Sequence, residues 1–298
     1  MIETDVRRAM AAARLRFEKA GVPDPARDAS ALFVQLIEDR IGPAEAMPTN
    51  LAQLYEDAVQ RRVRRQPVAQ ITGRRAFWMH DFIVTPDVLD PRPDTETLVS
   101  AALNARADML RDPDRWPHET DLTWPPIPFT RVLDLGTGSG CILVSLLHEC
   151  PTATGLGTDI SQAALDVAAR NADLVGVADR VELRQADWLD GVEGPFDMIV
   201  SNPPYIAAAE MLDLQPEVRD WEPHLALTPG GDGLAAYRII ARDALVHLTP
   251  GGWLMVEIGY GQGQAVTALW RQAGLTQIAV TKDLNGHDRV VSGQKAAA

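Results

Sequence analysis

The sequence predicts an α/β protein in which a mainly parallel sheet, covered by helices on both faces, follows a small helical domain. From Arg131 onward, short apolar runs typical of buried strands alternate with segments of helical periodicity. Residues 1–75 show helical spacing only, interrupted by Gly and Pro. We therefore expect an N-terminal helical bundle over residues 1–75, a connector over 76–94 and the sheet-containing domain over 95–298.

The N-terminal helices are predicted from the spacing of apolar residues, with polar residues between them. Breakers at Gly21–Pro25 and Gly42-Pro43 separate three expected helices, at 2–20, 25–40 and 50–66. In the connector, the alternation around Phe77 and Phe82, followed by prolines, indicates a possible β-hairpin.

The rest of the chain follows a strand–helix order. Seven strands are expected, at 131–136, 154–160, 181–187, 196–202, 252–258, 276–284 and 287–293. Helices are expected at 95–106, 139–149, 161–175, 233–247 and 262–273. Residues 107–130 hold five prolines with little periodicity, so we expect an irregular surface loop there. Only Asn285-Gly286 separates the last two strands, which predicts a terminal hairpin and one antiparallel edge.

The charge of the chain is unevenly distributed. The formal net charge is −13, but residues 1–75 contain 13 basic and 10 acidic residues, whereas residues 76–298 contain 15 basic and 31 acidic residues. Because Lys and Arg supply most of the affinity for phosphate backbones, so acidic a domain disfavours direct nucleic-acid binding. The cluster of arginines within 61–65 is better interpreted as a solvated last helical turn than as a nucleic-acid site.

Several other classes of protein are disfavoured. The sequence has no apolar run of about 18 residues and no signal-peptide core at its start, so we expect a cytoplasmic protein with no membrane contact. Cys141 and Cys150 form no CxxC pair and are expected to pack in a helix as small apolar residues. The six histidines make no metal-binding motif, so we predict no metal.

The stretch "VLDLGTGSGCI" (132–142) reads as a strand, a glycine turn and the start of a helix. It does not fit the dinucleotide fingerprint GxGxxG, and no GK[ST] follows that would make a triphosphate loop. A GxGxG loop with Asp134 upstream suits a cofactor without a pyrophosphate. It resembles motif I of S-adenosylmethionine-dependent methyltransferases.

Acidic residues end the next two predicted strands. Asp159 is placed to accept both hydroxyls of a ribose, and Asp187 to accept an adenine amino group, with Trp188 covering the ring. Each has a simpler interpretation, Asp159 as a helix N-cap and Trp188 as a core residue. Three strand-end acids in series behind a glycine loop favour the cofactor site.

The stretch "FDMIVSNPPYIAA" (196–208) leaves a buried strand through Asn202, Pro203, Pro204 and Tyr205. Prolines have no backbone N–H, so this turn offers side-chain and backbone oxygens with few competing donors. Proline also stiffens the residue before it. Such a turn suits a planar NH₂ group, against which the ring of Tyr205 can stack. An ordinary Pro-Pro turn is the weaker alternative.

With these residues, the chain resembles the peptide chain release factor N5-glutamine methyltransferases. The matching stretches are "PVAQITG" (67–73), "VLDPRPDTE" (88–96), "LDLGTGSGCI" (133–142), "DIS" (159–161), "ADW" (186–188), "IVSNPPYI" (199–206), "EPHLAL" (222–227), "GGDGL" (230–234) and "GHDRVV" (286–291). The resemblance implies a seven-stranded Rossmann-like methyltransferase sheet and a helical domain that docks the substrate. It departs from the usual pattern at Gln70, Asp90 and Asp94, in or next to the connector.

The resemblance also implies the site and the reaction. S-adenosyl-L-methionine would lie along Gly136, Thr137, Gly138, Ser139 and Gly140, with Asp159, Asp187, Trp188 and Asn202 also lining its site, and Asn202, Pro203, Pro204 and Tyr205 would receive the substrate amide. The implied partner is a class-1 peptide chain release factor, methylated on the glutamine of its Gly-Gly-Gln motif.

Three other functions stay open from the sequence. The first is methylation of a ribosomal-protein glutamine, and the second is methylation of a nucleic-acid amino group, since similar NPPY turns occur in such enzymes. The third is a non-catalytic cofactor-binding module.

The segment containing Arg92, Thr95 and Glu96 would help shape a glutamine site, or is simply a proline turn that starts a helix.

Overall fold

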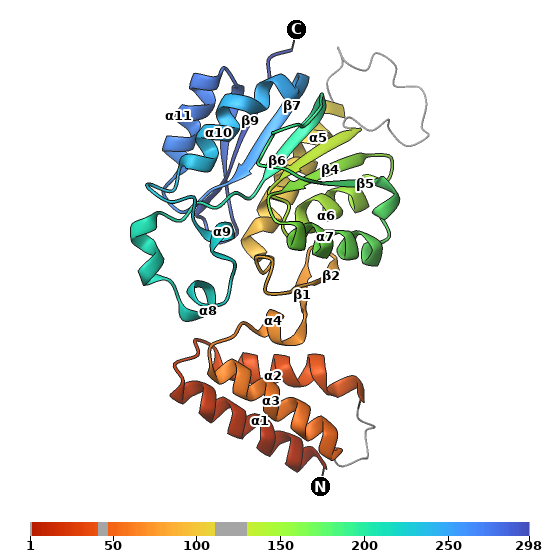
Figure 1. Cartoon of the computed structure of the whole chain (residues 1–298), viewed down its shortest axis with the longest axis vertical. Coiled ribbons are helices and arrows are strands. Elements are labelled where there is room, and N and C mark those ends of the chain that lie inside the picture. The colour runs from red at the N-terminus through yellow and green to blue at the C-terminus, as the bar shows by residue number, and fades with distance from the viewer. Residues whose placement is uncertain (1, 41–46, 111–129, 298) are drawn as a thin grey trace. The chain divides into compact units, whose positions relative to one another are not determined.

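The computed structural model of the protein describes residues 2–40, 47–110 and 130–297 (Figure 1). Most of the predicted surface loop 107–130 therefore lies outside the described residues. The chain divides into two compact units. We call residues 1–74, 84–86 and 214–222 the helical unit, and residues 75–83, 87–213 and 223–298 the sheet unit.

Among its described residues, the helical unit contains three longer helices and two short ones. These are α1 (Ile2–Lys19), α2 (Pro25–Leu36), α3 (Thr49–Val63), α4 (Val68–Thr72) and α8 (Pro216–Arg219), with a 3₁₀ turn at Glu38–Arg40. Phe17, Leu32 and Tyr55 are buried in its core, and the Tyr55 hydroxyl donates to the Ala29 carbonyl (3.0 Å). Two of the three predicted helices extend too far, because α2 ends at Leu36 and α3 at Val63.

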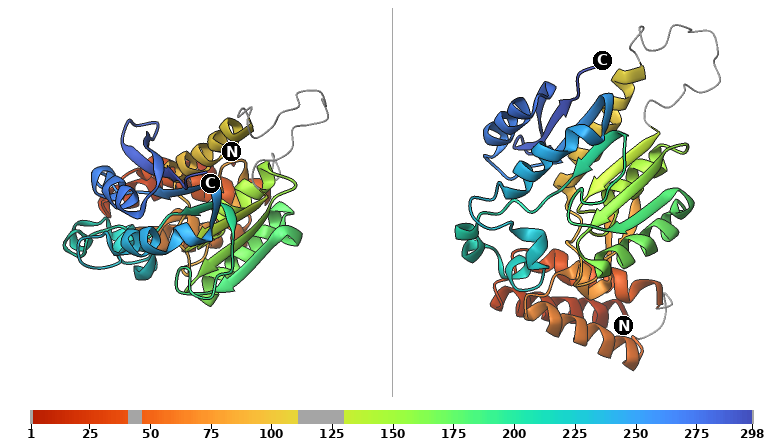
Figure 2. Two further views of the ribbon diagram at one scale, coloured as in Figure 1. Left: turned by 90° about the horizontal axis from the view of Figure 1, so that it is seen from above. Right: turned by 45° about the horizontal axis from the view of Figure 1, so that its top comes forward.

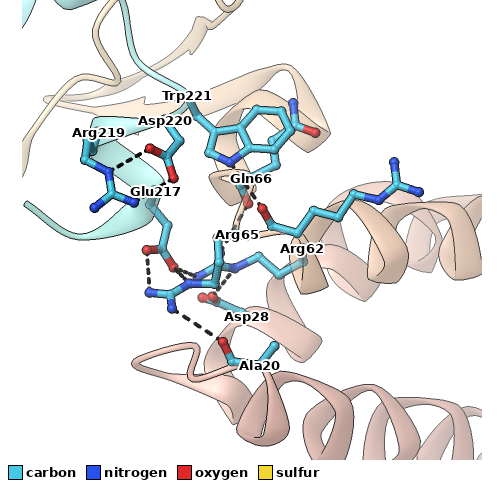
Figure 3. A network of polar contacts seen from close by, with 10 residues as sticks. Ala20, Asp28, Arg62, Arg65, Gln66, Glu217, Arg219, Asp220 and Trp221 are labelled. Atoms are coloured by element: carbon cyan, nitrogen blue, oxygen red, sulfur yellow. Dashed lines mark hydrogen bonds and ion pairs between the residues drawn. The ribbon is translucent and has the colours of Figure 1, made fainter.

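The interpretation of the arginines at 61–65 as solvated is wrong for all but the exposed Arg64. Arg61 is partly buried and donates to Gln66 and to the carbonyls of Gln70 and Ile71. Arg62 is only 4% exposed, and its guanidinium donates to Asp28 (2.7 Å) and to Glu217 (2.8 Å). Arg65 holds both carboxylate oxygens of the same Glu217 at 2.6 Å (Figure 3). Glu217 comes from a segment more than 150 residues further along the chain, so no local pattern could indicate that it neutralises these arginines.

The sheet unit contains a seven-stranded sheet in the order β5-β4-β3-β6-β7-β9-β8. Its strands are β3 (Arg131–Leu135), β4 (Thr154–Asp159), β5 (Val181–Gln185), β6 (Phe196–Ser201), β7 (Leu248–Glu257), β8 (Thr276–Lys282) and β9 (Asp288–Gln294). The first five are mutually parallel, as predicted. The terminal hairpin is confirmed, but β9, the strand antiparallel to its neighbours, lies between β7 and β8 rather than at the edge. The predicted connector hairpin is also present, as β1 (Arg74–Phe77) and β2 (His80–Ile83).

Helices cover both faces of this sheet (Figure 2). On one face, α5 (Glu96–Leu110), α6 (Cys141–Glu149) and α7 (Gln162–Val175) pack with Val132 and Met198. On the other, α10 (Ala235–Asp243) and α11 (Gly263–Ala273) pack with Leu133 and Ile199. Adjacent residues of one strand therefore enter different cores, as expected of a strand buried on both faces.

Other elements differ from the predictions in detail. The predicted helix 233–247 ends as a 3₁₀ turn at Ala244–His247, and a further 3₁₀ turn at Ala208–Asp213 and α9 (His224–Leu227) follow β6. Cys141 and Cys150 are both buried, but Cys150 comes one residue after α6 ends. None of the described helices has the length and apolarity that crossing a membrane requires.

Candidate active site

A cavity of about 570 Å³ lies within the sheet unit, where four parallel strands end. Residues that follow these strands line it: Gly136–Ser139 after β3, Asp159 at the end of β4, Asp187 and Trp188 after β5, and Asn202 after β6. Since the carboxyl ends of parallel strands share one edge of a sheet, the topology brings together residues that are far apart in sequence.

The glycine loop is held open by the backbone and by one buried acid. Gly136 and Gly138 have φ values of +67° and +55°, which residues with a Cβ rarely adopt. The Thr137 amide donates to the Thr158 carbonyl (2.9 Å), and its hydroxyl donates to Asp134 (2.7 Å). These bonds hold Thr137 against the ends of β3 and β4, and residues 136–139 line the cavity.

Gly140 belongs to the turn but does not line the cavity. Its φ is +78°, and a Cβ at this position would lie 3.1 Å from the Cβ of Ala168 on α7. The third glycine of the motif therefore allows α6 to begin close against α7.

The Asp159 carboxylate is already part of this loop. Its Oδ2 accepts from the Gly138 amide (2.9 Å), and its Oδ1 accepts from the Ser161 amide (2.9 Å). The N-cap of α7 is Ser161, whose hydroxyl accepts from Ala164. A carboxylate has about four acceptor positions, so Asp159 retains capacity toward the cavity.

Asp187 and Trp188 form the next part of the wall. Asp187 is exposed, and Trp188 has a φ of +54° and packs partly against the hydrophobic core. Thr158 donates to the Trp188 carbonyl (3.1 Å). A ring atom of Trp188 lies 4.0 Å from the position of a Cβ added at Gly136, so the indole borders the glycine loop.

The residues of the NPPY turn do not all face the cavity. Asn202 and Pro204 line it, whereas Pro203 is buried and Tyr205 is not among the lining residues that are described. The Tyr205 hydroxyl donates to the buried Glu257 at the end of β7 (3.3 Å). The Asn202 carboxamide donates through Nδ2 to the Thr95 hydroxyl oxygen (3.2 Å).

The segment 92–96 contributes residues that the predicted site omits. Arg92 and Thr95 line the cavity, and Thr95 is only 2% exposed. Glu96 instead accepts from the Trp78 amide of the β1–β2 hairpin (2.8 Å), and Asp94 lies 3.4 Å from Arg289. The turn thus starts a helix and also contributes two residues to the cavity wall.

Two buried acids stand behind the cavity wall. Burial raises the pKa of Asp134 to about 7, although the hydrogen bond from Thr137 acts in the opposite direction and lowers this pKa. Burial also raises the pKa of Glu257 to about 7, opposed by the Thr95 hydroxyl, Arg289 and Tyr205. Glu257 was missed by the sequence analysis, although an acid that ends a predicted strand was the available signal.

A last wall comes from residues 223–229, which include α9, and from the start of α10. The stretch "EPHLAL" falls here, although no structure was predicted for it. Throughout the described part of the chain, no cluster of His, Cys, Asp and Glu has the composition of a metal site.

The fold and the cavity define the class of protein. Residues 122–218 match the family described as Methyltransferase small domain. The solved structure of the hMettl16 catalytic domain in complex with a MAT2A 3′UTR hairpin shares the fold, with a TM-score of 0.56 at 16% identity, over 93% of this chain and 94% of that chain. The protein is a methyltransferase.

Sequence relatives then define the family. Residues 8–73 match the family described as PrmC N-terminal domain. The release factor glutamine methyltransferase of Cereibacter sphaeroides is 50% identical, over 97% of this chain and 98% of the relative. That of Caulobacter vibrioides is 42% identical, over 97% and 96%. The chain belongs to the release factor glutamine methyltransferase family, which confirms the resemblance inferred from its motifs.

Proposed function

We propose that the protein transfers a methyl group from S-adenosyl-L-methionine to the side-chain amide nitrogen of the glutamine in the Gly-Gly-Gln motif of class-1 peptide chain release factors. The observation that supports this most directly is the position of Asn202. Its carboxamide lines the same cavity as Gly136 and Gly138. A candidate receptor for a planar amide and a candidate cofactor loop therefore line the same cavity.

The cavity fits S-adenosylmethionine. The open loop at Gly136–Ser139 would lie along the cofactor, Asp159 and Asp187 would accept from its hydroxyl and amino groups, and Trp188 would contact its adenine. No phosphate-binding pattern is needed, because the cofactor has no pyrophosphate. When bound, S-adenosylmethionine supplies an electrophilic methyl group on a sulfonium.

The substrate amide would meet acceptors rather than donors. Asn202 Oδ1 accepts no hydrogen bond from the residues that the structure describes. The carbonyls of Tyr205 and Ile206 are already used, by Gln262 (2.9 Å) and Thr228 (2.6 Å). Pro204 lines the cavity, and its carbonyl accepts none from the described chain, so the turn retains an oxygen beside Asn202 Oδ1 for a substrate NH₂.

These acceptors address the weak nucleophilicity of an amide nitrogen, whose lone pair is delocalised. Two oxygens that bind both N–H groups would hold the nitrogen in one orientation and offset the positive charge that develops as it attacks. Bringing the reacting atoms to about 3–3.5 Å supplies a further part of the rate. No strong base is required beforehand, because the methylated nitrogen is acidic and loses its proton afterward.

Methylation of a purified release factor tests the proposal. The protein is incubated with S-adenosylmethionine carrying a labelled methyl group, and the Gly-Gly-Gln peptide is analysed by mass spectrometry. We expect one methyl group on the glutamine nitrogen. Replacing Asn202→Ala should lower kcat about a hundredfold or more, with S-adenosylhomocysteine affinity largely retained.

The alternative functions give different outcomes in the same assay. If a ribosomal-protein glutamine were labelled and the release factor were not, the ribosomal protein would be the substrate. Label on RNA, with a steep dependence on salt, would favour a nucleic-acid substrate, which the acidic sheet domain disfavours. The predicted cytoplasmic location follows from the proposed partner and stays a prediction.

A further inference from the structure

We propose that Thr95 is a positioning residue for methyl transfer, whose hydroxyl fixes the orientation of the Asn202 carboxamide so that Oδ1 faces the substrate. The proposal rests on the proposed function, since it assigns how the amide receptor is oriented. Thr95 ends the short turn Pro93–Thr95, more than 100 residues before Asn202 in the chain.

The geometry fixes which end of the carboxamide is free. Thr95 Oγ1 accepts from Asn202 Nδ2 at 3.2 Å, and the Thr95 side chain is almost completely buried. A carboxamide has one oxygen and one NH₂ group on opposite sides. With Nδ2 held by Thr95, Oδ1 is the end left for a substrate N–H.

A threonine hydroxyl can also donate, so its hydrogen needs another direction when Oγ1 accepts from Asn202. The buried Glu257 is the nearby carboxylate, and the Thr95 hydroxyl lowers its pKa. Glu257 Oε2 has no hydrogen-bond partner among the described residues. A charged Glu257 would attract the hydroxyl hydrogen and leave the Thr95 lone pairs for Asn202.

Without the hydrogen bond to Thr95, the Asn202 carboxamide could rotate by half a turn. It would then present its NH₂ group to the substrate NH₂ group, and two donors would face each other across a partly buried contact. Tyr205 belongs to the same arrangement, because its hydroxyl donates to Glu257 and its carbonyl accepts from Gln262 (3.3 and 2.9 Å). These two bonds hold both ends of Tyr205, and with it the turn, in place.

The kinetic test compares two substitutions that differ in one hydroxyl. Thr95→Val keeps the shape and removes the hydroxyl, and we expect kcat for the release factor to fall about ten- to a hundredfold with little change in KM. Thr95→Ser keeps the hydroxyl and should restore kcat to within about threefold of the unsubstituted protein. S-adenosylhomocysteine affinity should not change in either variant.

Thr267→Val provides the matched control. Thr267 is buried on α11, its hydroxyl has no hydrogen-bond partner in the described chain, and it does not line the cavity. It should leave kcat unchanged. Equal losses of kcat after Thr95→Val and after Thr95→Ser, or full activity after Thr95→Val, would overturn the proposal.

A second readout needs no substrate and separates this inference from the proposed function. The side-chain NH₂ signals of Asn202, assigned by their loss after Asn202→Ala, are followed by ¹⁵N NMR in the full chain. One of the two hydrogens should exchange slowly in the unsubstituted protein and after Thr95→Ser, and rapidly after Thr95→Val. Unaltered exchange after Thr95→Val would refute the claim that Thr95 holds the Asn202 carboxamide, even if the release factor proved to be the wrong substrate.

The role of Glu257 beside Thr95 also predicts that kcat depends on pH. Because burial raises the pKa of Glu257 to about 7, kcat should fall as pH decreases through that value, since a protonated Glu257 no longer attracts the hydrogen of the Thr95 hydroxyl. The charged and titratable groups that face Glu257 are Tyr205, Tyr237, Cys141, Arg289 and Asp94. Of these, burial raises the pKa of the two tyrosines and Cys141, and none has its ordinary pKa near 7. Glu257→Gln should remove this decrease in kcat. If kcat of the variant depends on pH as in the unsubstituted protein, Glu257 does not orient the Thr95 hydroxyl.

Discussion

Replacing Glu217→Gln tests whether a segment from the C-terminal half of the chain is part of the helical unit. Glu217 accepts three hydrogen bonds of 2.6–2.8 Å from Arg62 and Arg65 (Figure 3). Its side chain is 12% exposed, and those of Arg62 and Arg65 are 5% and 19% exposed. The substitution keeps the size of Glu217 but removes its charge and offers an NH₂ group to guanidinium donors.

The expected cost follows from these contacts. Removing one partner of a fully buried ion pair costs about 3–5 kcal/mol, because the other charge stays buried without compensation. Arg62 retains Asp28 at 2.7 Å, and Arg65 is partly solvated. We therefore expect the free energy of opening of the helical unit to decrease by about 2–4 kcal/mol.

Amide hydrogen exchange of the full chain measures this by region. Protection in α2 and α3 should decrease, whereas α10 and α11 of the sheet unit serve as internal references. Asp220→Asn is the matched control, because Asp220 belongs to the same segment but pairs with Arg219 at the surface, where the side chains are 48% and 40% exposed. It should change protection little. Equal effects of the two substitutions would refute the reasoning.

The same network predicts a dependence on pH. Burial by itself raises the pKa of Glu217, but the hydrogen bonds from Arg65 and Arg62 hold it below its ordinary value. A lowered folded pKa contributes stability above the unfolded pKa of about 4.3. The difference in stability between the unsubstituted protein and the Glu217→Gln variant should therefore begin to decrease as pH falls below about 4.3 and continue to decrease as pH falls through the lower folded pKa.

Three further predictions concern the sheet unit. Since burial raises the pKa of Glu257 from 4.5 to about 7, its contribution to stability is present below the unfolded pKa and is lost as pH rises through 7; Glu257→Gln should flatten this part of the curve of unfolding free energy against pH. Gly140→Ala should lower the unfolding free energy by about 1–3 kcal/mol in denaturant titration, because the positive φ is strained and the Cβ meets Ala168 at 3.1 Å. Asn171→Ala should cost about 1–3 kcal/mol and loosen the glycine loop, because Asn171 bonds both Ile83 and the Ser139 carbonyl (2.7 and 2.8 Å).

Each of these has its own control. Gly176 has a φ of +80° with nothing within 4 Å of an added Cβ, so Gly176→Ala measures the backbone strain alone. If it costs as much as Gly140→Ala, the contact with Ala168 contributes nothing. Asn171→Ala should also weaken S-adenosylhomocysteine binding, and unchanged affinity would show that Ser139 does not depend on Asn171. A stability curve that keeps its slope near pH 7 after Glu257→Gln would contradict the first prediction.

Much of the candidate site could be predicted because its signals are local. Glycine at 136 and 138 allows the positive φ values that the loop adopts, and the acids at strand ends could be found by locating the end of each predicted strand. Thr95 could be noticed within its segment but not assigned, because its partner Asn202 is distant in sequence. Glu257 ends a strand like the other acids, but its role depends on which side chains the sheet order places beside it.

The sequence alone determined that strands and helices alternate along the chain, and hence that the sheet is mainly parallel. Apolar periodicity and turn residues are local signals that involve only residues close together in sequence. The sequence also determined the family, because nine stretches spread along the chain carry recognisable residues. Only the tertiary structure decided that β9 lies between β7 and β8, that Arg62 and Arg65 are neutralised by Glu217, and that Thr95 holds the Asn202 carboxamide. These are pairings between distant segments, and pairing depends on how whole surfaces pack rather than on the residues that adjoin each partner in the chain.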